Sequence, residues 1–171
     1  ILIPALDSAG KLFEHGKIFL PQLIQTASVA QAAFEVIKTT LIERNAAPVS
    51  RGEIVLATVK GDIHDIGKNI VRVLLENYGY TVLDLGRDVP CQLVADTAKE
   101  HGVKLVGLSA LMTTTLGAME ETIQLVKASC PDCKIVVGGA VLTADYAEKI
   151  GADYYAKDAM ETVAVAKEVV G

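Results

Sequence analysis

The sequence predicts an α/β protein in which a helical N-terminal part precedes a doubly wound sheet of five parallel strands. Three observations support this fold class. From residue 53 onward, short apolar runs alternate five times with segments of helical periodicity. Residues 1–45 show helical periodicity only. Hydrophobic residues make up 51% of the chain and aromatic residues only 5%, which suits Val-, Ile- and Leu-rich strands buried between helices.

Residues 1–45 are predicted to form a helical cap of two helices. The first ends at Gly16, because glycine is favoured just beyond the end of a helix. The second begins at Pro21, which a first helical turn tolerates, and carries an apolar face to about Arg44. Two helices alone bury too little apolar surface, so the cap must pack on further helices, on the α/β part or on a ligand. Residues 46–52 have linker character.

Residues 53–171 are predicted to form one domain of flavodoxin-like or Rossmann-like type. The expected strands are 53–59, 80–84, 104–108, 134–138 and 153–156. The expected helices are 67–78, 91–101, 116–129, 143–150 and 158–170. Five strand–helix units of this length imply a parallel sheet with right-handed crossover connections.

Several common function classes do not fit the sequence. The net charge of −5 leaves no basic stripe for nucleic acid as the main partner. No apolar run is long enough to span a membrane and no signal peptide is evident, so a cytoplasmic protein is expected. The glycine pattern that binds dinucleotides does not follow the first strand, and the P-loop pattern is absent as well.

The three cysteines, Cys91, Cys130 and Cys133, do not indicate a disulfide framework, because their number is odd and no secretory context is evident. Cys130 and Cys133 have the spacing of redox and zinc sites. A zinc site would need two further ligands, and no second pair exists in the sequence. A redox pair should open a helix after a strand, whereas this pair precedes a strand. We interpret it as a helix-to-strand turn.

The loop after the first predicted strand, residues 60–69, is the strongest candidate for a functional site. It lies at the carboxyl end of a strand, where open α/β sheets bind ligands. His64 stands between carboxylates at positions 62 and 65, an arrangement that suits a metal-facing imidazole whose second nitrogen donates to an acid. Gly61 and Gly67 allow tight turns and the close approach of a large ligand. The alternative is that His64 only satisfies a hydrogen bond within the loop.

Two further loops complete the candidate site. Residues 109–115, after the third strand, contain four hydroxyl side chains in seven positions, whereas one would suffice to cap the following helix. Residues 138–140, after the fourth strand, contain two glycines that would let a flat ligand lie against the backbone. Together the three loops predict a deep slot lined by Gly, Ser and Thr, with His64 at its mouth.

These motifs resemble the three-part signature of cobalamin-binding domains. The matching segments are Gly61–Gly67, Ser109–Leu111 and Gly138–Gly139. Independently, residues 12–22 look like the cap segment of the cobalamin module of methionine synthase and of corrinoid methyl-carrier proteins. The resemblance covers essentially the whole chain.

The resemblance implies a role for each part of the site. Cobalamin would bind base-off, with its nucleotide tail in the slot and His64 as the lower cobalt ligand. Asp62 would hydrogen-bond the far nitrogen of His64, and Thr115, where methionine synthase has serine, would extend this relay. Phe13 and Leu20 would shield the upper, methyl-bearing face of the corrin. The remaining implied cofactor contacts are Gly61, Ile63, Asp65, Ile66, Gly67, Ser109, Leu111, Thr113, Gly138 and Gly139.

The resemblance also implies a chemistry. Cobalt would cycle between methylcobalamin and the cob(I)alamin nucleophile, so that His64 must bind and release it. Both methyl donor and acceptor must reach the face that the cap covers, so the cap must move, with residues 46–52 as its hinge. The chain would then be a methyl-carrier component rather than a complete enzyme. Its partners would be a substrate-specific corrinoid methyltransferase, a second methyltransferase that accepts the methyl group, and a reductive activase.

Four alternatives remain at this point. The first is an excised cobalamin module of methionine synthase, which would have the same motifs. The second is the small subunit of an adenosylcobalamin-dependent mutase, which shares the histidine loop but lacks the helical cap. The third is a cobalamin light sensor, which would need a DNA-binding domain that is not seen here. The fourth is an α/β domain that binds no metal, which would leave all four motif matches coincidental.

Overall fold

The structure is a computed structural model that describes residues 2–43 and 50–171. Within the two N-terminal helices, the side chains of residues 2, 3, 7, 31, 34, 35 and 37–43 lie outside this description. The predicted linker, residues 46–52, is therefore described only from Ser50 onward. Among the described residues, no helix is both long enough and apolar enough to cross a membrane.

The sheet contains five parallel strands in the order β2-β1-β3-β4-β5. The strands are β1 (Glu53–Thr58), β2 (Thr81–Asp84), β3 (Leu105–Ser109), β4 (Lys134–Gly138) and β5 (Tyr154–Ala156). The helices of this part are α3 (Ile66–Asn77), α4 (Cys91–His101), α5 (Leu116–Ser129), α6 (Ala144–Lys149) and α7 (Ala159–Val169), with a short 3₁₀ helix η1 (Thr113–Thr115) before α5. Each of the ten predicted elements is present, with both ends within one residue of the prediction. The predicted fold class is confirmed.

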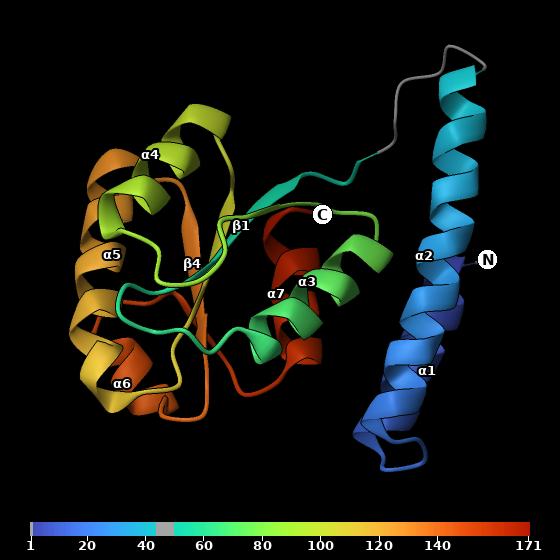
Figure 1. The fold of residues 1–171 in the computed structure, drawn as a ribbon, viewed down its shortest axis with the longest axis horizontal. Coiled ribbons are helices and arrows are strands. Elements are labelled where there is room, and N and C mark those ends of the chain that lie inside the picture. The colour runs from blue at the N-terminus through green and yellow to red at the C-terminus, as the bar shows by residue number, and fades with distance from the viewer. Residues whose placement is uncertain (1, 44–49) are drawn as a thin grey trace.

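The two faces of the sheet are covered by different helices, as Figure 1 shows. Along β1, Val55 and Ala57 point into the core beneath α4, α5 and α6, whereas Ile54 and Leu56 point toward α3 and α7. This alternation follows from the two-residue period of a strand, and burial on both faces explains why β1 reads as a continuous apolar run.

The cap consists of α1 (Leu2–Glu14) and α2 (Leu20–Glu43). Figure 1 shows the two helices side by side, on the α3 side of the sheet. Their buried side chains belong to the same core as α3, α7 and one face of the sheet; these are Leu6, Ala9, Leu23, Ala27 and Ala30. Gly10 allows this contact, because a Cβ atom there would lie 2.5 Å from the Met160 Cε atom of α7. The α/β part thus buries one face of the cap.

The strand order places a topological switch point between β1 and β3. The chain leaves β1 through α3 on one face of the sheet, and it leaves β3 through α5 on the other face. The loops that follow these two neighbouring strands therefore diverge, and a crevice opens between them at the carboxyl edge of the sheet. The loop that contains His64 borders this crevice.

The turn from α5 to β4 contains the cysteine pair. Cys133 donates its backbone N–H to the Cys130 carbonyl at 3.0 Å, which closes a tight turn. Both thiols are free. Burial, together with the neighbouring Cys130, raises the pKa of Cys133 from 9.0 to about 12, so this thiol is protonated at neutral pH and unreactive. The interpretation of the pair as a helix-to-strand turn agrees with this geometry.

Candidate functional site

The histidine loop, residues 59–65 between β1 and α3, is organised around the buried carboxylate of Asp62. Its Oδ1 atom accepts hydrogen bonds from the backbone N–H of His64 at 3.0 Å and from His64 Nδ1 at 2.8 Å. Its Oδ2 atom accepts from the backbone N–H groups of Leu111 at 2.6 Å and Met112 at 3.2 Å. One side chain therefore joins the loop after β1 to the loop after β3, across the switch point.

Asp62 is ionised in the folded protein. Burial by itself would raise its pKa, but the donors from His64, Leu111 and Met112 outweigh burial and lower the pKa from 3.8 to about 2. A carboxylate can only accept hydrogen bonds, so His64 carries its proton on Nδ1. The other ring nitrogen, Nε2, then has a free lone pair, and 47% of the His64 side chain is exposed.

Thr115 lies buried behind this pair, on η1. Its hydroxyl group is 3.2 Å from Asp62 Oδ2 and 2.8 Å from the Met112 carbonyl, and its single proton can be donated to only one of them at a time. The Thr115 methyl group lies next to residue 61: a Cβ atom at Gly61 would lie 3.4 Å from the Thr115 Cγ2 atom, an ordinary contact distance. The Thr115 hydroxyl, predicted from the sequence as the third member of the relay after His64 and Asp62, is therefore within hydrogen-bonding distance of Asp62.

Large apolar side chains are exposed on the same two loops and at the start of α3. Ile63 is 60% exposed, Ile66 79%, Leu111 42% and Met112 39%. Ile63 and Ile66 flank His64 in the sequence, and Leu111 and Met112 supply the backbone donors to Asp62. Apolar side chains gathered in this way mark a surface that something else covers. We call these four residues the apolar platform.

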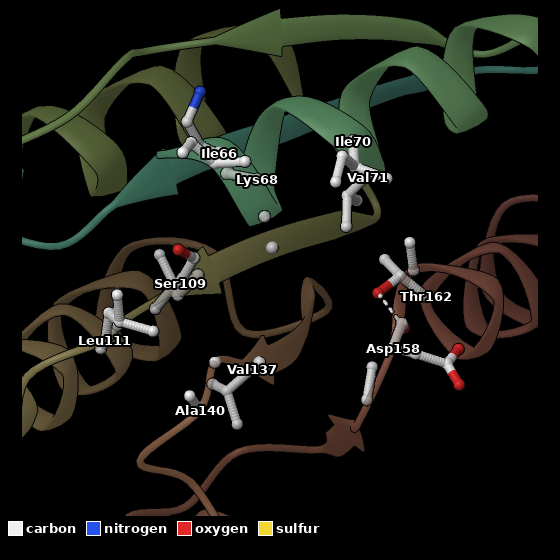
Figure 2. Close-up of a pocket in the computed structure, with 18 of the residues that line it drawn as sticks. Ile66, Lys68, Ile70, Val71, Ser109, Leu111, Val137, Ala140, Asp158 and Thr162 are labelled. Atoms are coloured by element: carbon white, nitrogen blue, oxygen red, sulfur yellow. Dashed lines mark hydrogen bonds between the residues drawn. The ribbon is translucent and has the colours of Figure 1, made fainter. Parts of the chain in front are cut away.

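A cavity of about 830 Å³ lies between the carboxyl edge of the sheet, α3, α7 and the cap. The cap contributes Phe13, Leu20 and Leu23 to its lining. Figure 2 shows Ile70 and Val71 of α3 across the cavity from Ser109 and Val137 of the strand ends, with Thr162 of α7 at one end. The lining is mainly apolar, with a few polar groups, as is typical of a site for an organic ligand.

Glycine is required where β4 ends at the cavity. Gly139 has a φ of 136°, and a Cβ atom there would overlap the carbonyl oxygen of Ala110. The two loops therefore approach each other backbone to backbone where they border the slot.

Most of the predicted site residues line this cavity. They are Phe13, Leu20, Ile63, His64, Asp65, Ile66, Gly67, Ser109, Leu111, Gly138 and Gly139. Gly61, Asp62 and Thr115 do not line it; Asp62 and Thr115 are buried behind His64. Thr113 is exposed on η1 and is not part of the lining, and its contact with a nucleotide tail stays a prediction.

The sequence prediction missed one wall of the cavity. Residues 155–160 and Thr162, at the end of β5 and the start of α7, line it, as do Arg87, Ile70 and Val71. The carboxyl end of β5 lies at the same edge of the sheet as the other strand ends, so topology alone would have pointed to it. The sequence gives no comparable indication for Ile70 and Val71 of α3, because an apolar helix face that lines a cavity has the same pattern as one packed in the hydrophobic core.

The donor set indicates what kind of metal group would fit. Among the described residues, no three His, Cys, Asp or Glu side chains gather around a common point that could hold a metal ion. One imidazole cannot retain a bare ion, but it can complete the coordination of a metal that a macrocycle already holds. A flat macrocycle would also cover the apolar platform and send an appended group into the slot. The residues present fit such a cofactor.

Comparisons with known proteins agree with this geometry. Two family models, both described as B12 binding domains, match residues 52–164 and residues 1–38. The dimethylamine corrinoid protein 1 of Methanosarcina acetivorans is 44% identical over 171 residues, which cover 99% of this chain and 80% of that protein.

Two solved structures share both sequence and fold. A cobalamin-binding protein from Desulfitobacterium hafniense DCB-2 has a TM-score of 0.81 and 36% identity, over 97% of this chain and 78% of that one. A chain of the methanol:cobalamin methyltransferase complex MtaBC from Methanosarcina barkeri has a TM-score of 0.86 and 31% identity, over 99% of this chain and 64% of that one.

Fold, site and comparisons define the class: a capped, doubly wound α/β protein that binds a B12-type cofactor. Within this class, the chain belongs to the family of corrinoid methyl-carrier proteins. The family resemblance stated from the sequence is therefore confirmed.

Proposed function

We propose that this chain binds its corrinoid base-off, with His64 as the lower ligand of cobalt, and carries a methyl group between two methyltransferases. The observation that carries the proposal is the state of the imidazole. His64 Nδ1 donates to a buried, ionised Asp62 at 2.8 Å, which fixes the ring and leaves the Nε2 lone pair free to bind a metal at the cavity.

Each wall of the cavity has a part in holding the cofactor. The apolar platform would lie against the lower face of the corrin around His64. The slot between the ends of β1, β3 and β4 would take the nucleotide tail, with the hydroxyl groups of Ser109 and Thr162 as its polar contacts. Phe13 and Leu20 of the cap would cover the opposite face and exclude water from it.

When bound, the corrinoid supplies a cobalt that accepts and gives up the methyl group. The protein orients the His64 ring through Asp62. Because the Thr115 hydroxyl can donate either to Asp62 Oδ2 or to the Met112 carbonyl, the charge on Asp62 can be stabilised more or less strongly without a movement of the backbone. The cap must leave the upper face whenever a partner enzyme approaches.

The relatives indicate the kind of partner. Several are named dimethylamine or trimethylamine corrinoid proteins, and one matched structure is a methanol:cobalamin methyltransferase complex. We infer that a substrate-specific methyltransferase methylates the bound corrinoid and that a second methyltransferase removes the methyl group. A reductive activase would restore cofactor that has become oxidised. These relatives favour the carrier over an excised module of methionine synthase.

Electron paramagnetic resonance of the protein loaded with cob(II)alamin tests the proposal. Nitrogen coordination from His64 should split each cobalt line into a triplet, which becomes a doublet when histidine is labelled with 15N. His64→Ala should abolish the effect of labelling. The matched control is His101→Ala, since His101 pairs with Glu53 on the surface and should have no influence. A triplet that does not change when histidine is labelled with 15N would show that the cofactor's own base remains bound, and would refute His64 coordination.

A second experiment tests the carrier role. The loaded and reduced protein should accept a methyl group from one of a panel of methylamine or methanol corrinoid methyltransferases, as followed by the visible spectrum of the corrinoid. Activity only with domains of methionine synthase would favour the excised module instead.

A further inference from the structure

The segment that leaves β2, residues 84–89, lies alongside the histidine loop. Asp88 donates its backbone N–H to the Asp62 carbonyl at 2.9 Å, and its Oδ1 atom accepts the backbone N–H of Gly61 at 2.7 Å. Next to it, Val89 forms a parallel bridge with Val59. Asp88 thus holds the backbone of the loop at the two residues that lead to the Asp62 carboxylate.

Asp88 has a backbone conformation that calls for an explanation. Its φ is 53°, and among residues 2–43 and 50–171 no other residue besides glycines has a positive φ. Residues with a Cβ atom rarely adopt this region, although Asp and Asn tolerate it best. The same conformation brings both the N–H and the carboxylate of Asp88 onto the histidine loop.

The same segment also contacts the first turn of α3, just beyond the histidine loop. The amino group of Lys68, in the first turn of α3, is buried and pairs with the Asp84 carboxylate. Asp84 Oδ1 also accepts the backbone N–H of Gly86 at 2.9 Å, which fixes the segment that carries Asp88. Asp88 therefore holds the loop before His64, and Asp84 holds the start of the helix that follows it.

These contacts matter because Asp62 accepts hydrogen bonds from four donors at once. Its two oxygens lie 2.6 to 3.2 Å from the Leu111 and Met112 amides and from the amide and ring nitrogens of His64. Hydrogen bonds weaken steeply with distance and angle, so a small shift of the loop would break part of this set. We propose that Asp88 is a positioning residue, which places Asp62 and through it aims the Nε2 atom of His64. This inference rests on the proposed His64 coordination.

Three substitutions separate this role from ordinary turn structure. Asp88→Gly removes the carboxylate and at the same time relieves the left-handed backbone. Asp88→Asn keeps an oxygen acceptor for Gly61 and tolerates the same backbone. Asp132→Gly is the matched control, because Asp132 is an exposed aspartate in the α5–β4 turn, at the opposite edge of the sheet. If Asp88 mattered only for its backbone, Asp88→Gly would behave as well as the natural protein.

Amide hydrogen exchange in the cofactor-free protein gives the first measurement. Asp88→Gly should accelerate exchange about tenfold or more at Gly61, and also at Leu111 and Met112, which Asp88 does not touch. Asp88→Asn and Asp132→Gly should leave the Leu111 and Met112 amides protected as in the natural protein. Loss of protection at Gly61 alone would show that Asp88 does not position Asp62, and would overturn the inference.

Spectroscopy of the loaded protein gives the second measurement. With cob(II)alamin bound, Asp88→Gly should lose the 15N-histidine splitting in most molecules and bind the corrinoid about tenfold more weakly, whereas Asp88→Asn should retain both. Full His64 coordination in Asp88→Gly would overturn the inference. If the natural protein itself shows no histidine splitting, the proposed function fails, and the exchange experiment still decides whether Asp88 positions Asp62.

Discussion

Asp62 is the side chain on which the site depends most. Its folded-state pKa is about 2, compared with 3.8 for an unperturbed aspartate. The folded state therefore gains stability from the ionised form above pH 4, and this gain is lost as the pH falls toward 2. A shift of this size corresponds to about 2 kcal/mol.

We therefore expect the acid sensitivity of the protein to change when Asp62 is replaced. Asp62→Asn removes the titration, so the free energy of unfolding should fall by about 2 kcal/mol less between pH 4 and pH 2 than it does in the natural protein. Urea unfolding at a series of pH values measures the difference. Identical pH profiles for the two proteins would contradict the lowered pKa.

Thr115 provides a second prediction for a single residue. Thr115→Val keeps the shape but removes the hydroxyl that lies between Asp62 and the Met112 carbonyl, and should lower the free energy of unfolding by about 1 to 2 kcal/mol. Thr115→Ser keeps the hydroxyl and should lower the free energy of unfolding by less, because only a methyl group is lost. Chemical denaturation distinguishes the two. A larger loss in Thr115→Ser than in Thr115→Val would mean that the methyl group, not the hydroxyl, matters there.

At the scale of elements, the sequence was a good guide wherever local signals decide the structure. Each strand of the α/β part is an apolar run bounded by turn residues, so its ends could be placed to within one residue. The histidine loop could also be located from the sequence, because its histidine, aspartates and glycines indicate a ligand-binding loop after a strand. The contributions of Ile70 and Val71 to the cavity could not be predicted, because a helix face directed at a ligand and one directed at a core have the same pattern.

Backbone proximity was another feature that the sequence only hinted at. The two glycines after β4 suggested a close approach, but the contact with Ala110 is visible only in the structure. Asp88 carried no sequence signal at all, because an aspartate before a helix reads as ordinary loop chemistry.

The approach of the β3 and β4 loops leads to a prediction for Gly139. Gly139→Ala places a Cβ atom against the Ala110 carbonyl at a φ of 136°, and should lower the free energy of unfolding by about 2 kcal/mol or more. Gly117→Ala is the control: Gly117 lies in the first turn of α5, the added Cβ meets nothing within 4 Å beyond its chain neighbours and the backbone of its own helix, and the change should raise stability by up to about 1 kcal/mol. Thermal and urea unfolding report both. Similar effects of the two substitutions would argue against the close loop contact.

At the scale of the whole molecule, the cap both completes the cavity and closes it. Phe13 and Leu20 line the cavity on the side of the cap. Gly10 of α1 packs against the Met160 side chain of α7. The predicted hinge, residues 46–52, lies largely outside the described residues, so cap movement stays a prediction.

A tethered cap would test this movement. Gly10→Cys and Met160→Cys, combined with Cys130→Ser, would place two thiols close enough for a short crosslinker, since the remaining cysteines are buried. The crosslinked protein should keep a corrinoid loaded beforehand but should lose methyl transfer with a partner enzyme at least tenfold, and cleavage of the linker should restore it. Full transfer with the crosslink intact would rule out cap opening as a required step.

The apolar platform has a consequence for the life of the protein in the cell. If the corrinoid lies on these residues as proposed, a newly made chain exposes Ile63, Ile66, Leu111 and Met112 together until the cofactor binds. Exposed apolar clusters invite aggregation, and a ligand that binds only the folded state raises its stability by mass action. We therefore expect the supply of corrinoid to govern how much of this protein accumulates, so that abundance follows vitamin availability without any change in gene expression.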